Sequence, residues 1–266
     1  MKKRLFVVMI AVLPGAFGTV FAGRPLAVND TEPVENGMWQ IEASGDYWKD
    51  SSQKHADIPF TLDYGLLPDV DLTIGFGGQY NREKTDGATC CEHGCSDLYV
   101  YPRWKFLDQS DFLPSQAVSF TVKFPTASCN RGLGSGGNDY NLTWIASEKI
   151  GKDWQVDANI GYSWIGAHAD ADVDGRNLIL YGVALEYQLS ESVQWVGEAF
   201  AQREMGSDGE TTAQYDSGFR WSACENLTFD IAAGSKICGE APDFYATAGL
   251  TWVFGLEKKE SLPPTK

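Results

Sequence analysis

Six cysteines are the residues of this chain most able to bind a metal ion or to form a covalent bond. Three of them stand beside His93 in CCEHGC, at 90–95, which has neither a zinc-site spacing nor the C-x-x-C-H motif of covalent haem. In an exported protein, such cysteines form disulfide bonds by default. We therefore predict disulfide bonds, without assigning pairs, among Cys90, Cys91, Cys95, Cys129 and Cys238. All five lie in long polar links between predicted strands, which we call the outer loops.

The segment DADVDG, at 170–175, begins like a calcium-binding loop of the D-x-D-x-D-G type. The twelfth position of such a loop would be Tyr181 instead of a glutamate, and no helical pattern flanks the segment. An acidic loop tip is therefore the favoured interpretation. A divalent cation held by Asp170, Asp172 and Asp174 is kept as the alternative. The sequence has no pattern for an organic cofactor, and none is expected.

The three histidines, His55, His93 and His168, are the residues best suited to act as catalytic bases. All three fall in predicted outer loops, where none is fixed on a strand beside a serine. His168 and Asp170 form the best candidate dyad. The sequence therefore favours a protein that is not an enzyme, with an outer-membrane hydrolase kept as an alternative.

A larger group of charged residues recurs on the polar faces of predicted strands. In a membrane channel, rings of charge select what crosses, whereas in a narrow barrel salt bridges between such residues fill the interior. Both outcomes are open at this stage. We predict that the group lines the interior of a barrel, and its members are Glu42, Asp63, Asp71, Arg103, Lys105, Lys123, Asp157, Glu186, Glu198, Arg220 and Asp230.

The elements that carry these charges are β-strands of alternating polarity. In WQVDANIGYSW, at 154–164, every second residue is apolar or aromatic, and the residues between them are polar or small. This period of two is typical of a strand with one apolar and one polar face. The pattern recurs through residues 37–255 and predicts about twelve strands, each near the ~10 residues that a tilted membrane strand needs.

The connections between these strands alternate in length. Short turns are predicted at 66–69, 149–153, 189–192 and 223–226, with a slightly longer one at 109–115. Longer polar links fall between them, at 48–57, 81–96, 125–138, 166–176, 205–212 and 236–243. This alternation predicts an all-β fold, a transmembrane antiparallel up-and-down β-barrel with tight turns at one rim and outer loops at the other. Its apolar face is expected to contact lipid.

The beginning of the chain predicts export. Residues 1–22 have a basic start, a short apolar core, and Val20 and Ala22 at the positions where a signal peptidase expects small residues, as a signal peptide does. The polar residues 23–36 either enter the lumen as a plug or lie in the periplasm, and 256–266 form a tail. The net charge of -15 argues against nucleic acid as a partner.

Five stretches resemble the outer-membrane family called "MetA-pathway of phenol degradation", a group of candidate transporters. They are GRPLAVNDTEPVENGMWQIE, AVSFTVKFPTAS, RGLGSGGNDYNLTW, YGVALEYQLSESVQWVGEAF and APDFYATAGLTWVF. The resemblance covers nearly the whole chain after residue 22, and the cysteine-rich loop and the tail depart from it. It implies a barrel of the bacterial outer membrane that passes small molecules, including aromatic or hydrophobic ones.

The functional prediction is therefore an outer-membrane channel for passive passage of small molecules. Its expected partners are outer-membrane lipid and a small-molecule solute, with a divalent cation at the acidic outer loop as the alternative noted above. A closed barrel that only displays surface loops, as a structural protein or adhesin does, is the main competing function.

Overall fold

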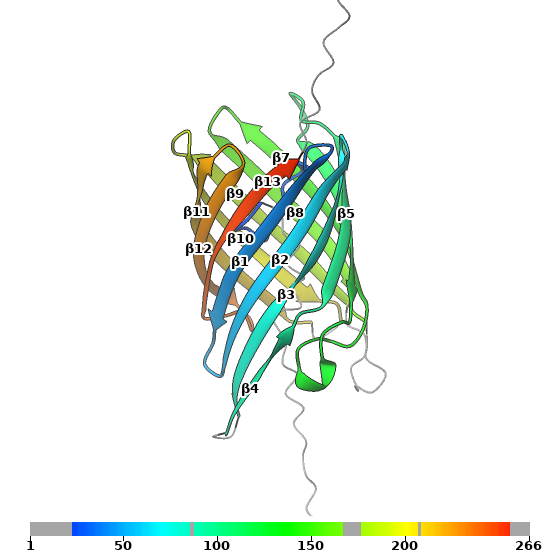
Figure 1. Cartoon of the computed structure of the whole chain (residues 1–266), viewed down its shortest axis with the longest axis vertical. Helices are drawn as coiled ribbons and strands as arrows, with labels where there is room; N and C mark the ends of the chain where they lie inside the picture. The colour runs from blue at the N-terminus through cyan, green and yellow to red at the C-terminus, as the bar shows by residue number, and fades with distance from the viewer. Residues whose placement is uncertain (1–22, 86–87, 167–176, 207–208, 256–266) are drawn as a thin grey trace, which may run out of the picture.

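The computed structural model describes residues 23–85, 88–166, 177–206 and 209–255, and these form one closed antiparallel sheet (Figure 1). The ring closes because β1 pairs with β2 on one side and with β13 on the other. No helix among the described residues is long and apolar enough to cross a membrane. The elements are β1 (Met38–Lys49), β2 (Gln53–Leu67), β3 (Val70–Thr85), β4 (Ala88–Cys95), β5 (Leu98–Leu107), β6 (Ser115–Phe124), the short 3-10 helix η2 (Cys129–Arg131), β7 (Asp139–Ile150), β8 (Trp154–Trp164), β9 (Asn177–Gln188), β10 (Val193–Glu204), β11 (Thr211–Cys224), β12 (Leu227–Cys238) and β13 (Phe244–Gly255).

Twelve strands form the circumference, and β4 continues the sheet beyond it. β5 pairs with the first half of β3, whereas β4 pairs with its second half, from Gly78 onward. The hairpin of β3 and β4 therefore projects past the rim of the barrel (Figure 1). The predicted barrel of about twelve strands is confirmed. The predicted long loop at 81–96 is wrong, because most of its backbone is paired in this hairpin.

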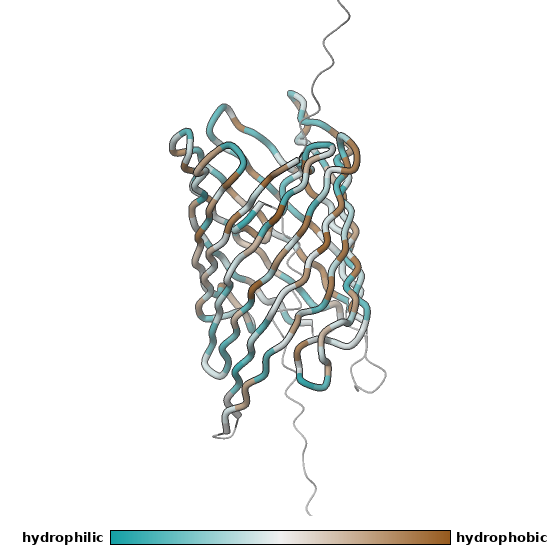
Figure 2. The backbone as a smooth tube through the Cα atoms, viewed as in Figure 1, coloured by the Kyte–Doolittle hydropathy of each residue, from teal (hydrophilic) through white to brown (hydrophobic). Residues whose placement is uncertain are grey.

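The apolar face of the strands lies on the outside of the barrel. In β8, Trp154, Ile160 and Trp164 are exposed, whereas Asp157 and Ser163 are buried. Polar and apolar residues alternate along the strands in the same way around the ring (Figure 2). Since the sheet is closed, the buried polar side chains lie in the interior. The expected orientation, with apolar side chains outward and polar ones inward, is what the structure has.

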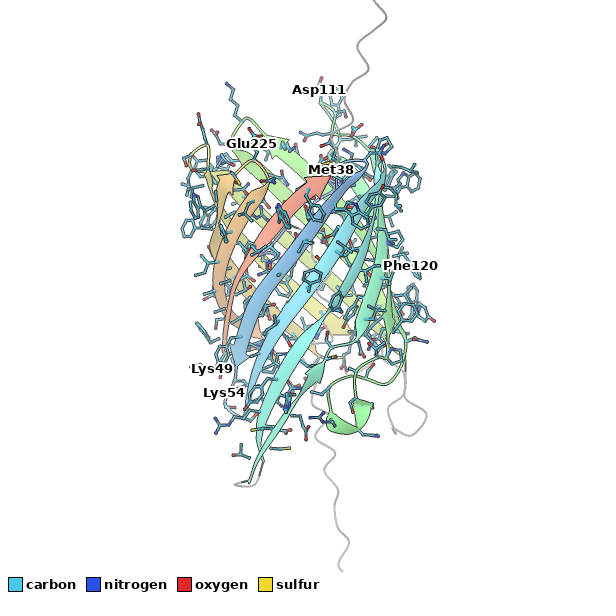
Figure 3. The ribbon with its side chains drawn as sticks, viewed as in Figure 1. Met38, Lys49, Lys54, Asp111, Phe120 and Glu225 are labelled. Carbon is cyan, nitrogen blue, oxygen red and sulfur yellow. The ribbon has the colours of Figure 1, made fainter. Side chains whose placement is uncertain are left out.

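Aromatic side chains gather on the outer surface towards the two ends of the strands. Trp39 and Tyr64 lie with ring centroids 4.4 Å apart, as do Trp154 and Tyr187. Towards the other end, Tyr47 and Phe244 lie with ring centroids 6.5 Å apart, and Phe120, about halfway along the wall, points away from it (Figure 3). Such aromatic girdles mark the two interfaces between lipid and water in membrane barrels.

The two rims differ in their connections, and we name them accordingly. The short-turn rim, with Asp111 and Glu225, is uppermost in Figure 3, and the long-loop rim lies at the end of Lys49 and Lys54. Strands at the short-turn rim are joined at 68–69, 151–153, 189–192 and 225–226, and more widely at 108–114; the link at 125–138 is at the long-loop rim.

The predicted alternation of loop lengths is only partly right. The predicted link at 48–57 shrinks to 50–52, because β1 and β2 continue their pairing as far as Lys49 and Gln53. Beyond the lipid both faces of a strand contact water, so polar residues occupy both faces although the backbone pairing continues. A prediction from polarity alone therefore ends these strands several residues too early.

We predict that Ile160→Arg destabilises the folded barrel by roughly 2–4 kcal/mol, the cost of a cation near the middle of a bilayer. Ile160 is 52% exposed and lies in β8 between Trp154 and Trp164, away from both interfaces. The measurement is the free energy of unfolding from a reversible denaturant titration in lipid vesicles.

The matched control is Ile160→Leu, which keeps an apolar side chain of the same volume and is expected to cost less than about 1 kcal/mol. An arginine variant as stable as the leucine variant would mean that this face contacts water and not lipid.

Candidate functional site

Residues 23–36, which we call the inner segment, run inside the barrel along its wall. From its beginning to its end, the segment contacts β12 and β13 first, then β10, then β7 and β6, and finally β3. It therefore circles most of the lumen. The hydrogen-bonding partners lie on β1, β12 and β13 for Arg24, β10 for Ala27 and Val28, β6 and β7 for Thr31, β3 for Val34 and β2 for Gly37, the residue that follows the segment.

Arg24 anchors the first part of the inner segment. Its Nη1 donates to Ser44 Oγ at 2.6 Å, and its Nε and Nη2 donate to the Asp230 carboxylate at 3.3 and 3.2 Å. Burial by itself lowers the pKa of the Arg24 guanidinium, but the carboxylates of Asp230 and Asp46 outweigh that effect and raise the pKa above its ordinary value. Arg24 therefore stays charged, and the barrel wall neutralises it.

Glu198 holds the middle of the inner segment. Its two carboxylate oxygens accept hydrogen bonds from the backbone N–H groups of Ala27 and Val28, each at 2.7 Å. The side chains of Leu26 and Val28 are buried in a small apolar cluster that includes Phe200. A segment without secondary structure has unpaired backbone donors, and here a buried carboxylate on β10 satisfies two of them.

The later part of the inner segment is held in the same manner. The backbone N–H of Thr31 donates to Ser147 Oγ at 3.0 Å, and its hydroxyl lies 2.6 Å from Ser115 Oγ. The backbone N–H of Val34 donates to Asp71 Oδ2 at 3.0 Å. Side chains of the wall therefore satisfy backbone groups of the segment all along its course.

Three cations of the wall also contact the inner segment. Arg103 Nη2 lies 2.5 Å from Asp71 Oδ2, and its Nη1 donates to the backbone carbonyl of Asp30. Lys105 Nζ lies 3.1 Å from Glu32 Oε2. Arg220, paired with Glu186 at 2.8 Å, donates to the backbone carbonyls of Gly23 and Arg24.

Two glycines of the wall make room for the inner segment. A β-carbon at Gly249 would lie 2.5 Å from Arg24 Nε, and one at Gly182 would lie 2.6 Å from Cγ2 of Val28. Neither distance is compatible with a side chain at that position. The wall is therefore shaped to receive these two residues.

The charged residues predicted to line the lumen all lie on the inner face of the wall, and they fall into two sets. One set contacts the inner segment directly, and the other pairs within the wall. The first set is Asp71, Arg103, Lys105, Glu198, Arg220 and Asp230; the second is Glu42, Asp63, Lys123, Asp157 and Glu186.

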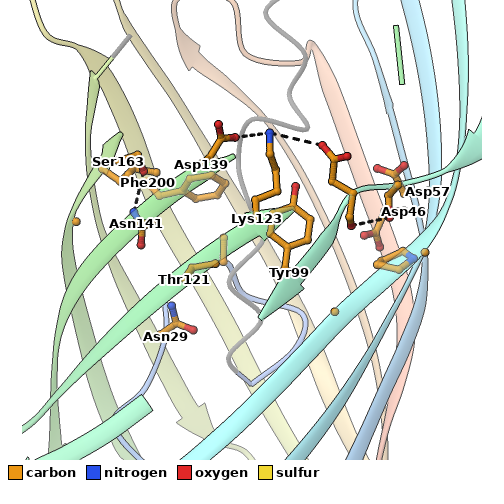
Figure 4. A pocket seen from close by; sticks show the side chains of 18 of the residues that line it. Asn29, Asp46, Asp57, Tyr99, Thr121, Lys123, Asp139, Asn141, Ser163 and Phe200 are labelled. Atoms are coloured by element: carbon orange, nitrogen blue, oxygen red, sulfur yellow. Dashed lines mark hydrogen bonds and ion pairs between the residues drawn. The ribbon is translucent and has the colours of Figure 1, made fainter. Parts of the chain in front are cut away.

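A cavity of about 300 Å³, which we call the outer vestibule, lies between the inner segment and the long-loop rim (Figure 4). Asn29 of the segment lines it at one end, and Leu133 and Ser135 of the link at 125–138 line it at the other. On its wall, Lys123 forms ion pairs with Asp97, at 3.5 Å, and with Asp139.

Aromatic side chains that the alternation did not predict also face the outer vestibule. They are Trp48, Tyr99, Tyr101, Phe200 and Tyr245. A signal for four of them was present in the sequence: Trp48 follows Tyr47, Tyr245 follows Phe244, and Tyr99 and Tyr101 stand in LYVY, where both faces of the strand are apolar or aromatic. When two aromatic residues are adjacent on a strand, one must point inward.

The six cysteines are all free thiols in this structure, so the disulfide bonds predicted among Cys90, Cys91, Cys95, Cys129 and Cys238 are absent from it. The reason is the β3–β4 hairpin. Its register places Cys90, Cys91 and Cys95 opposite Glu83, Arg82 and Gly78, none of which is a cysteine. Cys238 lies far around the ring, opposite Ala213 of β11.

The predicted outer-loop position is wrong for two histidines. His55 lies on β2 and is buried inside the barrel, where its ring stacks on Trp48 and contacts Asp57 and Asn81. His93 lies on β4. The cause is again the continuation of paired strands into polar sequence.

The third histidine, His168, and the candidate cation ligands Asp170, Asp172 and Asp174 lie outside the described residues. Among the residues that are described, no group of three His, Cys, Asp or Glu side chains is placed to hold a metal ion.

Comparisons with known proteins agree with the barrel. The model of the family described as "Putative MetA-pathway of phenol degradation" matches residues 22–254. The NanC porin superposes with a TM-score of 0.57 at 10% sequence identity, covering 80% of this chain and 98% of NanC. The KdgM porin in complex with disordered oligogalacturonate gives 0.53 at 10% identity, covering 81% and 99%.

The translocator domain of the autotransporter NalP from Neisseria meningitidis gives a TM-score of 0.54 at 10% identity, covering 82% of this chain and 87% of that domain. At such identities the likeness concerns the fold, which is that of outer-membrane barrels. No curated protein matches the chain. The closed sheet and its apolar outer face agree with a place in the bacterial outer membrane.

We predict that Arg24→Gln lowers the free energy of unfolding by roughly 3–5 kcal/mol, because it leaves the buried carboxylate of Asp230 without its cation. The unfolding titration in vesicles measures this loss. Hydrogen exchange at the backbone N–H groups of Ala27 and Val28 is expected to become faster, since the inner segment loses its first anchor.

Arg131→Gln is the matched control, because Arg131 forms an exposed ion pair with Glu92 at 2.7 Å. Exposed pairs contribute about 0–1 kcal/mol. Equal losses in the two variants, with unchanged exchange in the inner segment, would show that Arg24 does not anchor it.

Proposed function

The chain belongs to the family described as "Putative MetA-pathway of phenol degradation", and from this premise and the geometry of the lumen we propose that it is an outer-membrane channel for small molecules. We also propose that a signal peptide at 1–22 directs export of the chain and that the outer face of the barrel contacts lipid. Two of the barrels with a similar fold are porins.

The outer vestibule is the observation that carries this proposal. A barrel whose interior is filled by side chains leaves no space for a solute, and a barrel of this size stands between that case and an open pore. Here about 300 Å³ is free on the long-loop side, which is the lower end of the range for ligand pockets. A small molecule therefore fits in the lumen, whereas a large one does not.

The lining of the vestibule supports the finer proposal of a solute with an aromatic or apolar part. Trp48, Tyr101 and Tyr245 supply aromatic surface, and Asn141 and Thr143 supply polar groups. Ligand sites commonly combine apolar surface with a few polar groups that fix orientation.

In this proposal the inner segment sets the narrowest part of the passage. It occupies the short-turn side of the lumen and holds its position through side chains of the wall. The lumen charges, among them Asp157, Glu186 and Arg103, then act on whatever passes the segment, in the way that rings of charge act in channels.

A closed barrel that displays its loops is the competing function. The many hydrogen bonds between the inner segment and the wall favour it, because a segment held this firmly obstructs passage. The two functions make opposite predictions for electrical conductance.

We predict that the purified protein forms ion-conducting channels in planar bilayers, and that Arg24→Gln gives a larger single-channel conductance, because it releases the first part of the inner segment. Arg131→Gln, on the surface, should leave the conductance unchanged. Sealed bilayers for both the wild type and Arg24→Gln, with the folded barrel present in the membrane, would reject the channel and leave the display function.

A second electrical measurement tests the lumen charges. Asp157 is buried on the inner face of β8, and its carboxylate accepts hydrogen bonds from Gln155. We expect Asp157→Asn to lower the permeability ratio of cations to anions, because it removes a negative charge from the passage. The reversal potential in a salt gradient measures this ratio, and an unchanged potential would place Asp157 off the conducting path.

A further inference from the structure

The geometry points to a binding site for a small organic ammonium ion on one wall of the outer vestibule, formed by β10, β11, β13 and β1. The ligand class is a protonated amine with an aromatic or apolar body. The site names the class of solute for the proposed channel. A role of this site in passage rests on the proposed function, whereas binding of an ammonium ion to the site does not.

The register of the sheet brings the residues of this wall into one row. Glu198 of β10 is opposite Asp216 of β11, which is opposite Gly234 of β12. Gly234 is in turn opposite Tyr245 of β13, and Tyr245 is opposite Trp48 of β1. Residues directly opposite in antiparallel strands present their side chains on the same face. Two carboxyl groups and two aromatic rings therefore form one row across the wall of the vestibule, with a glycine between them.

The vestibule is lined by more carboxyl groups than cations. Both of its fixed cations are already paired: Lys123 with Asp97 and Asp139, and Arg24 with Asp230 and Asp46. Among the described residues of the lining, these two cations stand against six carboxyl groups, which are Asp46, Asp57, Asp97, Asp139, Glu198 and Asp216.

Asp216 is the member of this row that lacks a partner on one oxygen. Its residue is 3% exposed, and its Oδ1 has no hydrogen-bond partner among the described residues, although it lines the cavity. Glu198, by contrast, has both oxygens engaged with the inner segment. A buried acceptor without a donor costs free energy. The N–H groups of an ammonium ion would supply both the donor and the opposite charge.

The aromatic side of the row suits the rest of such a ligand. Trp48, whose ring stacks on His55, and Tyr245 beside it line the cavity with aromatic rings, and a cation is attracted to such rings. They also offer apolar surface for an aromatic body. An anion of the same shape would meet the carboxyl groups of Asp216 and Glu198, so the site is expected to exclude it.

The test is calorimetric titration of the full chain, folded in detergent micelles, with three ligands of one shape: benzylammonium, benzyl alcohol and benzoate. We expect benzylammonium to bind most tightly and benzoate least. Asp216→Asn should weaken benzylammonium binding about tenfold, the scale of one hydrogen bond to a charged group, and Asp216→Glu should restore much of it. Each variant is first checked to be folded by its resistance to unfolding in dodecyl sulfate at room temperature.

The matched control is Asp111→Asn, which removes the same charge at the opposite, short-turn rim, where Asp111 is exposed. It should leave binding unchanged, and it corrects for partition of the ligands into micelles. Equal affinity of wild type and Asp216→Asn, or benzyl alcohol binding as tightly as benzylammonium, would overturn the inference.

Conductance of the same samples separates this inference from the proposed function. Sealed bilayers with ammonium binding retained would reject the channel alone. Open channels whose protein does not distinguish benzylammonium from benzyl alcohol would reject the ammonium site alone.

Discussion

The rest of the structure depends on the requirement that every backbone N–H and C=O in contact with hydrocarbon be paired within the protein. Strands meet it only when the sheet closes, which it does here through the pairing of β1 with β13. Closure gives the sheet an outside that contacts lipid and an inside that does not. The alternation along each strand then sorts apolar side chains outward and charged ones inward, as in β8.

The same requirement applies to the polar groups that closure turns inward. The wall presents carboxylates such as Glu198 and Asp71, and the inner segment presents backbone N–H groups that no strand pairs. Each satisfies the other, with the N–H groups of Ala27 and Val28 bound to Glu198 and that of Val34 bound to Asp71. The segment is therefore part of the folded lumen, although it forms no regular element over most of its length.

This division explains what could be predicted from the sequence. A period of two is a local property of the chain, so the strands and the inward position of residues such as Asp157 follow from it. The partner of Glu198 lies 170 residues away, at Val28. No local pattern indicates that contact, so the sequence does not decide whether the inner segment enters the lumen or lies in the periplasm. The sequence predicts a loop at His55 and Trp48 because, beyond the lipid, strand pairing continues without alternation of polar and apolar residues. The prediction of disulfide bonds rests on the oxidising compartment outside the cytoplasm. The compartment does not determine the strand register, and the register keeps the cysteines apart.

The two halves of the lumen consequently differ in whether their buried polar groups have hydrogen-bond partners. On the short-turn side, Arg103 and Arg220 both have carboxylate partners within the wall. Hydrogen bonds to charged groups contribute about 1.5–3 kcal/mol each, so a solute that displaces the segment must replace several of them at once. On the long-loop side, Oδ1 of Asp216 has no hydrogen-bond partner within the described part of the chain, and it lies beside aromatic rings and free volume. In the proposed channel, a solute that binds there would not have to displace the inner segment, so we expect recognition to take place in the outer vestibule.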